Sequence, residues 1–457
     1  MAAHPPLCQI AFSVTDLART HRWYQDVFGF LPAGGTRLFR GPIASRVQGL
    51  PNAASTCWWL VDRQEFFQLE LFEFASPPVR PLPADWRPCD TGYTMVGLHV
   101  ADFDATLARL ASHKTRPLTA PVGPAGQRRV CVRDPEGVML ELLEDDPCAG
   151  FRRAHERPEI PVSACSVTLS VPDLERSRRF FVDTLGLPVL DGLRLHGPEH
   201  EALWGLAGAQ RKSLIVRSGD CVLEVVQYEN PVGKPWPDGY RISDQGLLNI
   251  ALGFRSKAAF DAAYARCAAA GYRGNWRPFN LGAWSVVYVN DDQGFSVELL
   301  FVRPWYDAPM GFRPAMAYVN ARTRIAAPPD AVWRVITDHA GMSKWTPLEC
   351  ALIRPGTPEP NGLGAVRRLT GPGTTIEEEV VRWEPLHRFD YRLTKGAPMR
   401  DHSGHVFLTP DGDGTRVQWT VSFRPVIPGT GPVLRTVLQR AFDGALRKLK
   451  SLVEARQ

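Results

Sequence analysis

Apolar and polar positions in residues 1–300 recur in one order: a strand-like run, a helix-like run, and then further strand-like runs. The first strand-like run covers 9–14. Asp16 follows in the N-cap position of a segment whose large apolar residues, over 23–28, have helical spacing. The same order begins again near residues 95, 166 and 249. The pattern therefore predicts four units, each of one strand, one helix and several strands.

These units form a longer repeat. The segment V-T-D-L-A-R-T-H-R-W-Y begins at Val14 and returns as V-P-D-L-E-R-S-R-R-F-F from Val171, 157 residues later. The turn D-x-x-G-x-x-x-E at Asp134 recurs at Asp291 with the same offset. A match at both ends with one offset indicates two copies of one domain, at 1–150 and 158–305.

The pattern changes after residue 316. An alternating strand over 318–325 is followed by a helix that opens at Pro328-Pro329-Asp330, then by several strands and a long amphipathic helix. The stretches 145–162 and 303–316 are rich in Pro and Arg and lack periodicity, so we interpret them as linkers. The chain is therefore predicted to be an α+β protein with a third domain at 316–457.

Composition narrows the class of protein. Hydrophobic residues make up 44% and charged residues 22% of the chain, which is usual for folded domains. The net charge of +5 comes from scattered arginines, and no stretch has the apolar length of a membrane span, so we expect no nucleic-acid partner and no membrane partner. The nine cysteines include no C-x-x-C pair, which favours reduced thiols and a cytoplasmic protein.

The repeated motifs V-x-D-L-x-R-[ST]-x-x-[FWY]-[FY]-x-x-x-[FL]-G and D-x-x-G-x-x-x-E-L resemble the vicinal oxygen chelate superfamily, which includes glyoxalase I, extradiol dioxygenases and bleomycin-resistance proteins. The resemblance implies that each copy is a glyoxalase-like domain in which paired βαβββ modules form a half-barrel. It also implies metal ligands at four strand positions, usually His, Glu or Gln. Because the superfamily includes lyases, isomerases, dioxygenases and binding proteins, it implies a fold and not one reaction.

Counting along the strands assigns these four positions in each copy. Two of the eight positions are not counted as ligands: Met95 in the first copy has a thioether, a poor ligand for a hard divalent ion, and Ser166 in the second stands where the family most often has histidine. The other positions supply the candidate ligands for a divalent metal ion, which are Gln9, Glu70 and Glu141 in the first copy and Glu224, Asn249 and Glu298 in the second.

Each of the four glutamates lies between apolar neighbours, as in Leu69-Glu70-Leu71. Strand alternation therefore places its carboxylate on the face opposite to them, towards the concave side of the half-barrel. Two interpretations stay open. In the first, the carboxylates chelate a metal or act as general acid and base, helped by Gln9 or Asn249. In the second, they are remnants of the fold that are solvated or paired with nearby arginines.

The third domain also resembles a known superfamily. The segments A-P-P-D-A-V-W-R-V-I-T-D, W-E-P-L-H-R-F-D-Y-R-L and L-T-P-D-G-D-G-T-R-V are similar to START-like, or polyketide-cyclase-like, proteins. The resemblance implies a helix-grip fold that holds a small apolar or polyketide-like ligand between an antiparallel sheet and the final helix. The candidate catalytic residues are Glu378, His402 and His405, and the candidate ligand contacts are Trp345, Tyr391 and Arg400.

Two functions from different classes follow. One is an enzyme of the lyase, isomerase or cyclase type that acts on an oxygenated, largely apolar metabolite. The other is a non-catalytic protein that binds or sequesters such a metabolite and has degenerate metal sites. The lack of histidine at the metal positions favours binding, or catalysis in the helix-grip domain alone, whereas three ligand-type domains in one chain favour chemistry. A monomer or a homodimer is expected. The monomer is included because tandem copies can supply internally the pairing that shorter relatives obtain by dimerising.

Overall fold

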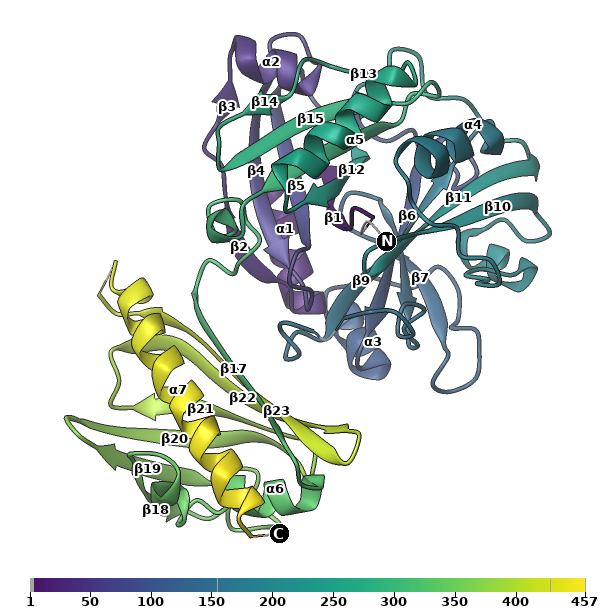
Figure 1. Ribbon diagram of the computed structural model, residues 1–457. Coiled ribbons are helices and arrows are strands. Elements are labelled where there is room, and N and C mark those ends of the chain that lie inside the picture. The colour runs from purple at the N-terminus through teal and green to yellow at the C-terminus, as the bar shows by residue number, and fades with distance from the viewer. Residues whose placement is uncertain (1–3, 154, 428, 457) are drawn as a thin grey trace. The chain divides into compact units, whose positions relative to one another are not determined.

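A computed structural model describes residues 4–153, 155–427 and 429–456 (Figure 1). The chain divides after Ala315 into two compact units. The first unit contains two β-sheets, here called sheet A and sheet B, and the second contains sheet C. Within the described ranges, no helix combines the length and the apolar character needed to cross a membrane.

Sheet A has ten strands, and its centre is formed by β12 (Gly246–Phe254), β1 (Leu7–Ser13) and β5 (Gln68–Ser76). The strands beyond β12 are β16 (Ser296–Val302), β15 (Trp284–Asn290), β13 (Arg273–Gly274) and β14 (Phe279–Asn280). The strands beyond β5 are β4 (Ala54–Val61), β2 (Leu31–Gly35) and β3 (Phe39–Arg40).

Sheet B has six strands, in the order β10 (Gln210–Ser218), β11 (Cys221–Asn230), β9 (Val162–Ser170), β6 (Gly92–Val100), β8 (Met139–Leu143) and β7 (Arg129–Arg133). The sequence predicted paired βαβββ modules within each copy of the repeat. In the structure the modules do pair, but each one pairs with a module of the other copy. β1 of the first copy lies antiparallel to β12 of the second, and β6 of the first lies antiparallel to β9 of the second. Each sheet therefore combines strands of both copies.

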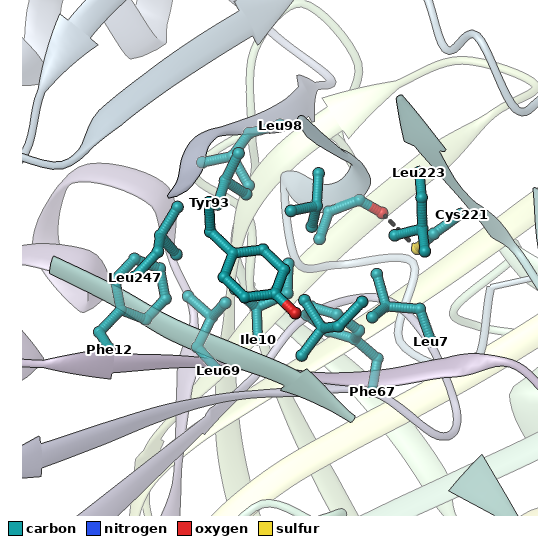
Figure 2. Close-up of a cluster of buried hydrophobic side chains, with 14 of the residues drawn as sticks. Leu7, Ile10, Phe12, Phe67, Leu69, Tyr93, Leu98, Cys221, Leu223 and Leu247 are labelled. Atoms are coloured by element: carbon teal, nitrogen blue, oxygen red, sulfur yellow. Dashed lines mark hydrogen bonds between the residues drawn. The ribbon is translucent and has the colours of Figure 1, made fainter. Parts of the chain in front are cut away.

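Four helices and the two sheets of the first unit share one apolar core. These helices are α1 (Leu17–Phe28), α3 (Phe103–Ser112), α4 (Leu174–Arg178), which continues as a π-helical turn (Arg179–Thr184), and α5 (Lys257–Ala269). A further helix, α2 (Pro42–Gln48), packs outside this core through Ala44 and Val47. Asp16 and Asp173 cap α1 and α4 through their side chains, as the repeated motif predicts. Figure 2 shows part of this core, with Ile10 of β1, Leu98 of β6 and Leu223 of β11.

The apolar neighbours of all four glutamates belong to this core. Leu69 and Leu71 flank Glu70 and are fully buried in it, and the residues that flank the other three glutamates are buried there too. Because side chains alternate along a strand, each glutamate points to the opposite face of its sheet, away from the shared core.

The second unit is a helix-grip fold. Its seven strands follow the order β17 (Ala317–Ile325), β23 (Gly414–Pro425), β22 (Met399–Asp411), β21 (Arg388–Lys395), β20 (Thr374–Glu384), β19 (Val366–Gly371) and β18 (Glu349–Arg354). The short helix α6 (Pro329–Ile336) and the long helix α7 (Gly431–Glu454) pack on one face of this sheet, and α7 runs across it (Figure 1).

Most of the stretch 303–316, which the sequence predicted to be a linker, packs on the first unit instead. A short 3₁₀ helix (Pro304–Tyr306) opens it, and Phe312 further along is fully buried against sheet A. The backbone amide of Ala315 also donates to the carbonyl of Pro32, at 2.7 Å. Residues 304–315 are therefore part of the first unit, because their apolar side chains find a buried position on it.

Candidate functional site

Four of the residues singled out in the sequence meet on the outward face of sheet A. They are Gln9 on β1, Glu70 on β5, Asn249 on β12 and Glu298 on β16. The sequence grouped Gln9 and Glu70 with Glu141. The structure instead joins them to Asn249 and Glu298, because β1 pairs with β12 of the other copy. We call these four residues the sheet A cluster.

Strand register explains why the four side chains converge. Ala11 of β1 pairs with Glu70 on one neighbouring strand and with Asn249 on the other. Ala251 of β12 pairs in the same way with the remaining two members. All of these positions share one face, and the small alanine side chains leave space between the longer polar ones.

Glu70 is the best-bonded member of the sheet A cluster. Its carboxylate contacts the side-chain amide of Gln9, accepts from Trp59 Nε1 at 2.9 Å and accepts from Cys57 Sγ at 3.1 Å. All of these groups are buried. The donors on β4 thus hold one carboxylate of the cluster in a fixed orientation.

The other two members lack such partners. Within the described residues, both amide atoms of Asn249 and the Oε2 atom of Glu298 are buried without a hydrogen-bond partner. Tyr288 pairs with Glu298 across β15 and β16 and is itself buried. Unpartnered buried polar atoms cost about 1–3 kcal/mol each, so Asn249 and Glu298 are candidates for contact with a bound group.

The electrostatics of the sheet A cluster point the same way. Burial raises the pKa of Glu70. Burial and then the charge of Glu70 raise the pKa of Glu298 well above its usual range. Neither carboxylate forms an ion pair with an arginine, lysine or histidine in the described part of the chain. The two acids therefore share a buried site with no positive charge to offset them.

The donor set of this cluster fits a hard divalent cation. Two carboxylates and two side-chain amides supply oxygen ligands, which suit Mg²⁺, Mn²⁺ or Ca²⁺ better than softer ions. Residues 4–153, 155–427 and 429–456 contain no group of three or more His, Cys, Asp or Glu arranged for a metal. Any metal site here therefore depends on the amide oxygens of Gln9 and Asn249 together with Glu70 and Glu298.

The equivalent positions of sheet B are occupied differently. Glu141 on β8 and Glu224 on β11 lie on either side of Met95 on β6 and Ser166 on β9. Between the two carboxylates lies the imidazole of His196, with Nε2 2.7 Å from Glu141 and Nδ1 2.5 Å from Glu224. We call Glu141, Glu224 and His196 the sheet B cluster.

His196 carries a positive charge in this position. Both ring nitrogens face carboxylate oxygens, so both carry hydrogen. Burial alone lowers the pKa of a histidine, but Glu141 and Glu224 outweigh it and raise the pKa of His196 to about 10. Arg211 donates to Glu224 at 2.9 Å and also pairs with buried Glu201.

The sheet B carboxylates are thus neutralised by the protein itself. Despite burial, the charges of His196 and Arg211 lower the pKa of Glu224 to about 2, and His196 lowers that of Glu141. The sequence interpretation in which glutamates pair with nearby arginines describes Glu224. His196 was missed because it lies just before a short 3₁₀ helix (Pro198–Trp204), where no periodic pattern marks it.

The helix-grip unit also contains a buried charged group. Arg367 on β19 donates to Glu378 at 3.0 Å and contacts Nε2 of His339 at 2.6 Å. Its guanidinium lies 5.0 Å from the ring of Tyr391, whose hydroxyl accepts from Trp419 Nε1 at 2.8 Å. The predicted residues Glu378 and Tyr391 therefore lie together, and Arg367 and His339 join them. Strand alternation could have identified Arg367, because it stands two residues before buried Leu369 and therefore lies on the same face of its strand.

The remaining predicted residues of this unit divide into two groups. Trp345 is buried, with its Nε1 atom unpartnered in the described residues, and His402 lies 5.7 Å from Tyr391 between ring centroids. His405 lies on the opposite face of sheet C, where it pairs with Asp390 at 3.1 Å, because it is displaced by one residue from inward-facing Val406. Arg400 is exposed and donates to the carbonyl of Val426 at 3.5 Å.

Comparison with known families agrees with the folds of the two units. Residues 8–132 and 165–299 match models of the Glyoxalase/Bleomycin resistance protein/Dioxygenase superfamily. The chain belongs to this glyoxalase superfamily. Residues 316–454 match a family described as Polyketide cyclase / dehydrase and lipid transport. The glyoxalase-like unit and the helix-grip unit correspond to these two assignments.

Individual proteins resemble separate parts of the chain. The uncharacterized protein YaeR of Escherichia coli K12 is 30% identical over 141 residues, which cover 30% of this chain and 92% of that protein. A glyoxalase I mutant from Zea mays is 18% identical over 65% of this chain and 94% of its own, with a TM-score of 0.45. XoxI from Bacillus cereus is 19% identical over 30% of this chain and 96% of its own, with a TM-score of 0.27.

Proposed function

We propose that the glyoxalase-like unit binds one divalent cation at the sheet A cluster and uses it for lyase or isomerase chemistry on a small oxygenated molecule. One observation carries the proposal: two buried carboxylates share one face of sheet A with unpartnered amide atoms and with no positive side chain paired to them in the described residues. A cation would replace the missing positive charge.

The side chains of the cluster have separate roles in this proposal. Glu70 and Glu298 would hold the ion with the amide oxygens of Gln9 and Asn249, and a bound cation polarises a substrate carbonyl or acidifies a hydroxyl. The indole of Trp59 and the thiol of Cys57 keep the Glu70 carboxylate in place.

Glu298 holds a proton in this proposal only while the cation is absent. Burial and the nearby Glu70 raise the pKa of Glu298, and a bound cation would displace its proton. Its partner across the strands, Tyr288, is buried beside it and fixes its position. The cation itself would polarise a substrate carbonyl and so favour the removal of a proton next to it.

Metal binding tests the proposal. The protein is purified without chelator or affinity tag, and Mn²⁺ binding is measured by electron paramagnetic resonance of the free ion. Wild type is expected to bind about one equivalent, Glu298→Gln to lose it, and the matched variant Glu141→Gln in sheet B to keep it while its circular dichroism stays native. The absence of binding in wild type, or its loss in Glu141→Gln alone, would contradict the proposal.

We also propose that the helix-grip unit binds a small apolar or polyketide-like ligand beside Tyr391. The buried, unpartnered Nε1 atom of Trp345 suits a ligand carbonyl. The Nδ1 atom of His402 accepts from the Leu393 amide at 3.3 Å, so its Nε2 atom carries the hydrogen and is free to donate. Calorimetric binding of a hydroxyanthraquinone probe is expected in wild type and should weaken in Trp345→Phe. Equal binding by both would contradict this assignment.

A further inference from the structure

Residues 304–315 lie over the same face of sheet A as the candidate cation site. Phe312 is fully buried, and its ring centroid is 4.5 Å from that of Phe66, just before β5. Asp307 pairs with Arg255 at 2.5 Å and anchors the start of the segment. A Cβ at Gly311 would overlap Trp59 and Gln68, so the segment approaches the sheet as closely as glycine permits.

The segment contacts the cluster through Gln68. Its side-chain amide faces the backbone carbonyl oxygens of Met310 and Gly311, at 3.1 and 2.7 Å, and the side-chain amide of Gln9, at 3.0 Å. Backbone carbonyls accept hydrogen bonds and cannot donate them. The NH₂ group of Gln68 therefore faces Met310 and Gly311, and its oxygen faces Gln9.

This orientation fixes the amide of Gln9 in turn. An oxygen of Gln68 next to Gln9 requires a donor, so Gln9 directs its NH₂ group at Gln68. This turn replaces the arrangement in which the NH₂ group of Gln9 donates to Glu70, and it points the amide oxygen of Gln9 at that carboxylate instead. Two oxygens meet at this point, and such a contact is stable only with a proton or a cation between them.

We propose that Gln68 is a positioning residue: held by the carbonyls of Met310 and Gly311, it turns the amide oxygen of Gln9 towards the cation position beside Glu70. This inference rests on the proposed cation site and adds to it the source of its geometry. The segment that leads to the helix-grip unit thereby controls a ligand of the site. If the segment moves away, Gln68 is free to turn and Gln9 presents an NH₂ group, which repels a cation.

A rescue experiment separates positioning from a general structural role. Gln68→Met keeps the side-chain volume but removes the amide, and it is expected to weaken Mn²⁺ binding about 10- to 100-fold, the usual effect of losing a partner that orients a ligand. Gln9→Glu presents an oxygen in either orientation. The double variant Gln9→Glu/Gln68→Met should therefore bind Mn²⁺ as tightly as wild type or more tightly.

A second variant perturbs the segment itself. Gly311→Ala displaces residues 310–312 from Trp59 and Gln68, and it should weaken Mn²⁺ binding and be rescued by Gln9→Glu in the same way. Metal-free thermal unfolding checks that each variant folds. Wild-type affinity in Gln68→Met, or failure of Gln9→Glu to restore it, would overturn the positioning role alone. If wild type binds no divalent cation, the proposed function falls and this inference falls with it.

Discussion

Sheets A and B place glutamates at equivalent strand positions, but the charges around the two pairs of glutamates differ. In sheet B, Glu141 and Glu224 enclose the imidazolium of His196, and Arg211 adds a second positive charge. In sheet A, Glu70 and Glu298 have amides, an indole and a thiol around them, and no positive side chain pairs with them in the described residues. One fold position can thus serve either as a closed ion pair or as a site for an external cation.

The difference arises from two residues that sheet A does not match, one on a loop and one on a strand. His196 enters from the segment before β10, and its carbonyl accepts from Nη2 of Arg211 on β10 at 3.0 Å, so the two positive groups hold each other in place. A buried carboxylate pair is costly without compensation. Sheet B is therefore stable without a metal, whereas sheet A keeps a cost that only binding or protonation removes.

The largest expected effect on stability comes from removing His196 from the sheet B cluster. His196→Ala removes the imidazolium that bridges the buried carboxylates of Glu141 and Glu224, and it should lower the free energy of unfolding by about 3–5 kcal/mol. Chemical denaturation measures the change. His200→Ala is the control, since His200 accepts from the Gly197 amide and otherwise lies 3.8 Å from the exposed carboxylate of Glu199, and its effect should stay at about 1 kcal/mol. Equal effects of the two substitutions would mean that His196 does not neutralise the pair.

A smaller effect on stability should come from Mn²⁺ binding to the sheet A cluster. At a Mn²⁺ concentration about 100 times the dissociation constant, the free energy of unfolding should rise by about 2.7 kcal/mol, because the ion binds only the folded state. The rise should vanish in Glu298→Gln. Thermal unfolding with and without Mn²⁺ gives the result, and an equal rise in that variant would place the ion elsewhere.

The pH dependence distinguishes the clusters further. The pKa of His196 is raised to about 10 from an ordinary value of 6.5, so its contribution to stability is complete below pH 6.5 and is lost as the pH rises towards 10. The stability difference between wild type and His196→Gln should shrink over this window, by at most about 1.4 kcal/mol per pH unit. Denaturation at pH 6, 8 and 10 tests it, and a constant difference would contradict a charged His196.

Much of the fold was predictable from the sequence. The periodic apolar positions and the repeated cap Asp16 predict the modules, since both depend on local chemistry. The pairing of β1 with β12 was not predictable, because the two copies carry the same pattern and order along the chain does not say which modules share a sheet. For the same reason, the sequence grouped Gln9 and Glu70 with Glu141, whereas the strand order places them beside Asn249 and Glu298.

The candidate sites were predictable only in part. Glu70 and Glu298 stand out as acids inside apolar strands, but His196 lies in an aperiodic segment and reaches Glu141 only through the tertiary fold. In the helix-grip unit, alternation would have marked Arg367, whereas the outward position of His405 depends on the strand register of β22. Local patterns thus reveal strand residues, and contacts from loops need the structure.

The stability of two glutamine variants in metal-free buffer tests the central claim most directly. Glu298 has a raised pKa, so it destabilises the folded state as the pH rises above its ordinary value. Glu298→Gln should therefore raise the free energy of unfolding at pH 8, with no gain at pH 4. Glu141 has a lowered pKa, so Glu141→Gln should lower the free energy of unfolding at pH 8. Changes of opposite sign support a sheet A cluster without a positive charge and a sheet B cluster that His196 neutralises. Changes of the same sign would contradict the account.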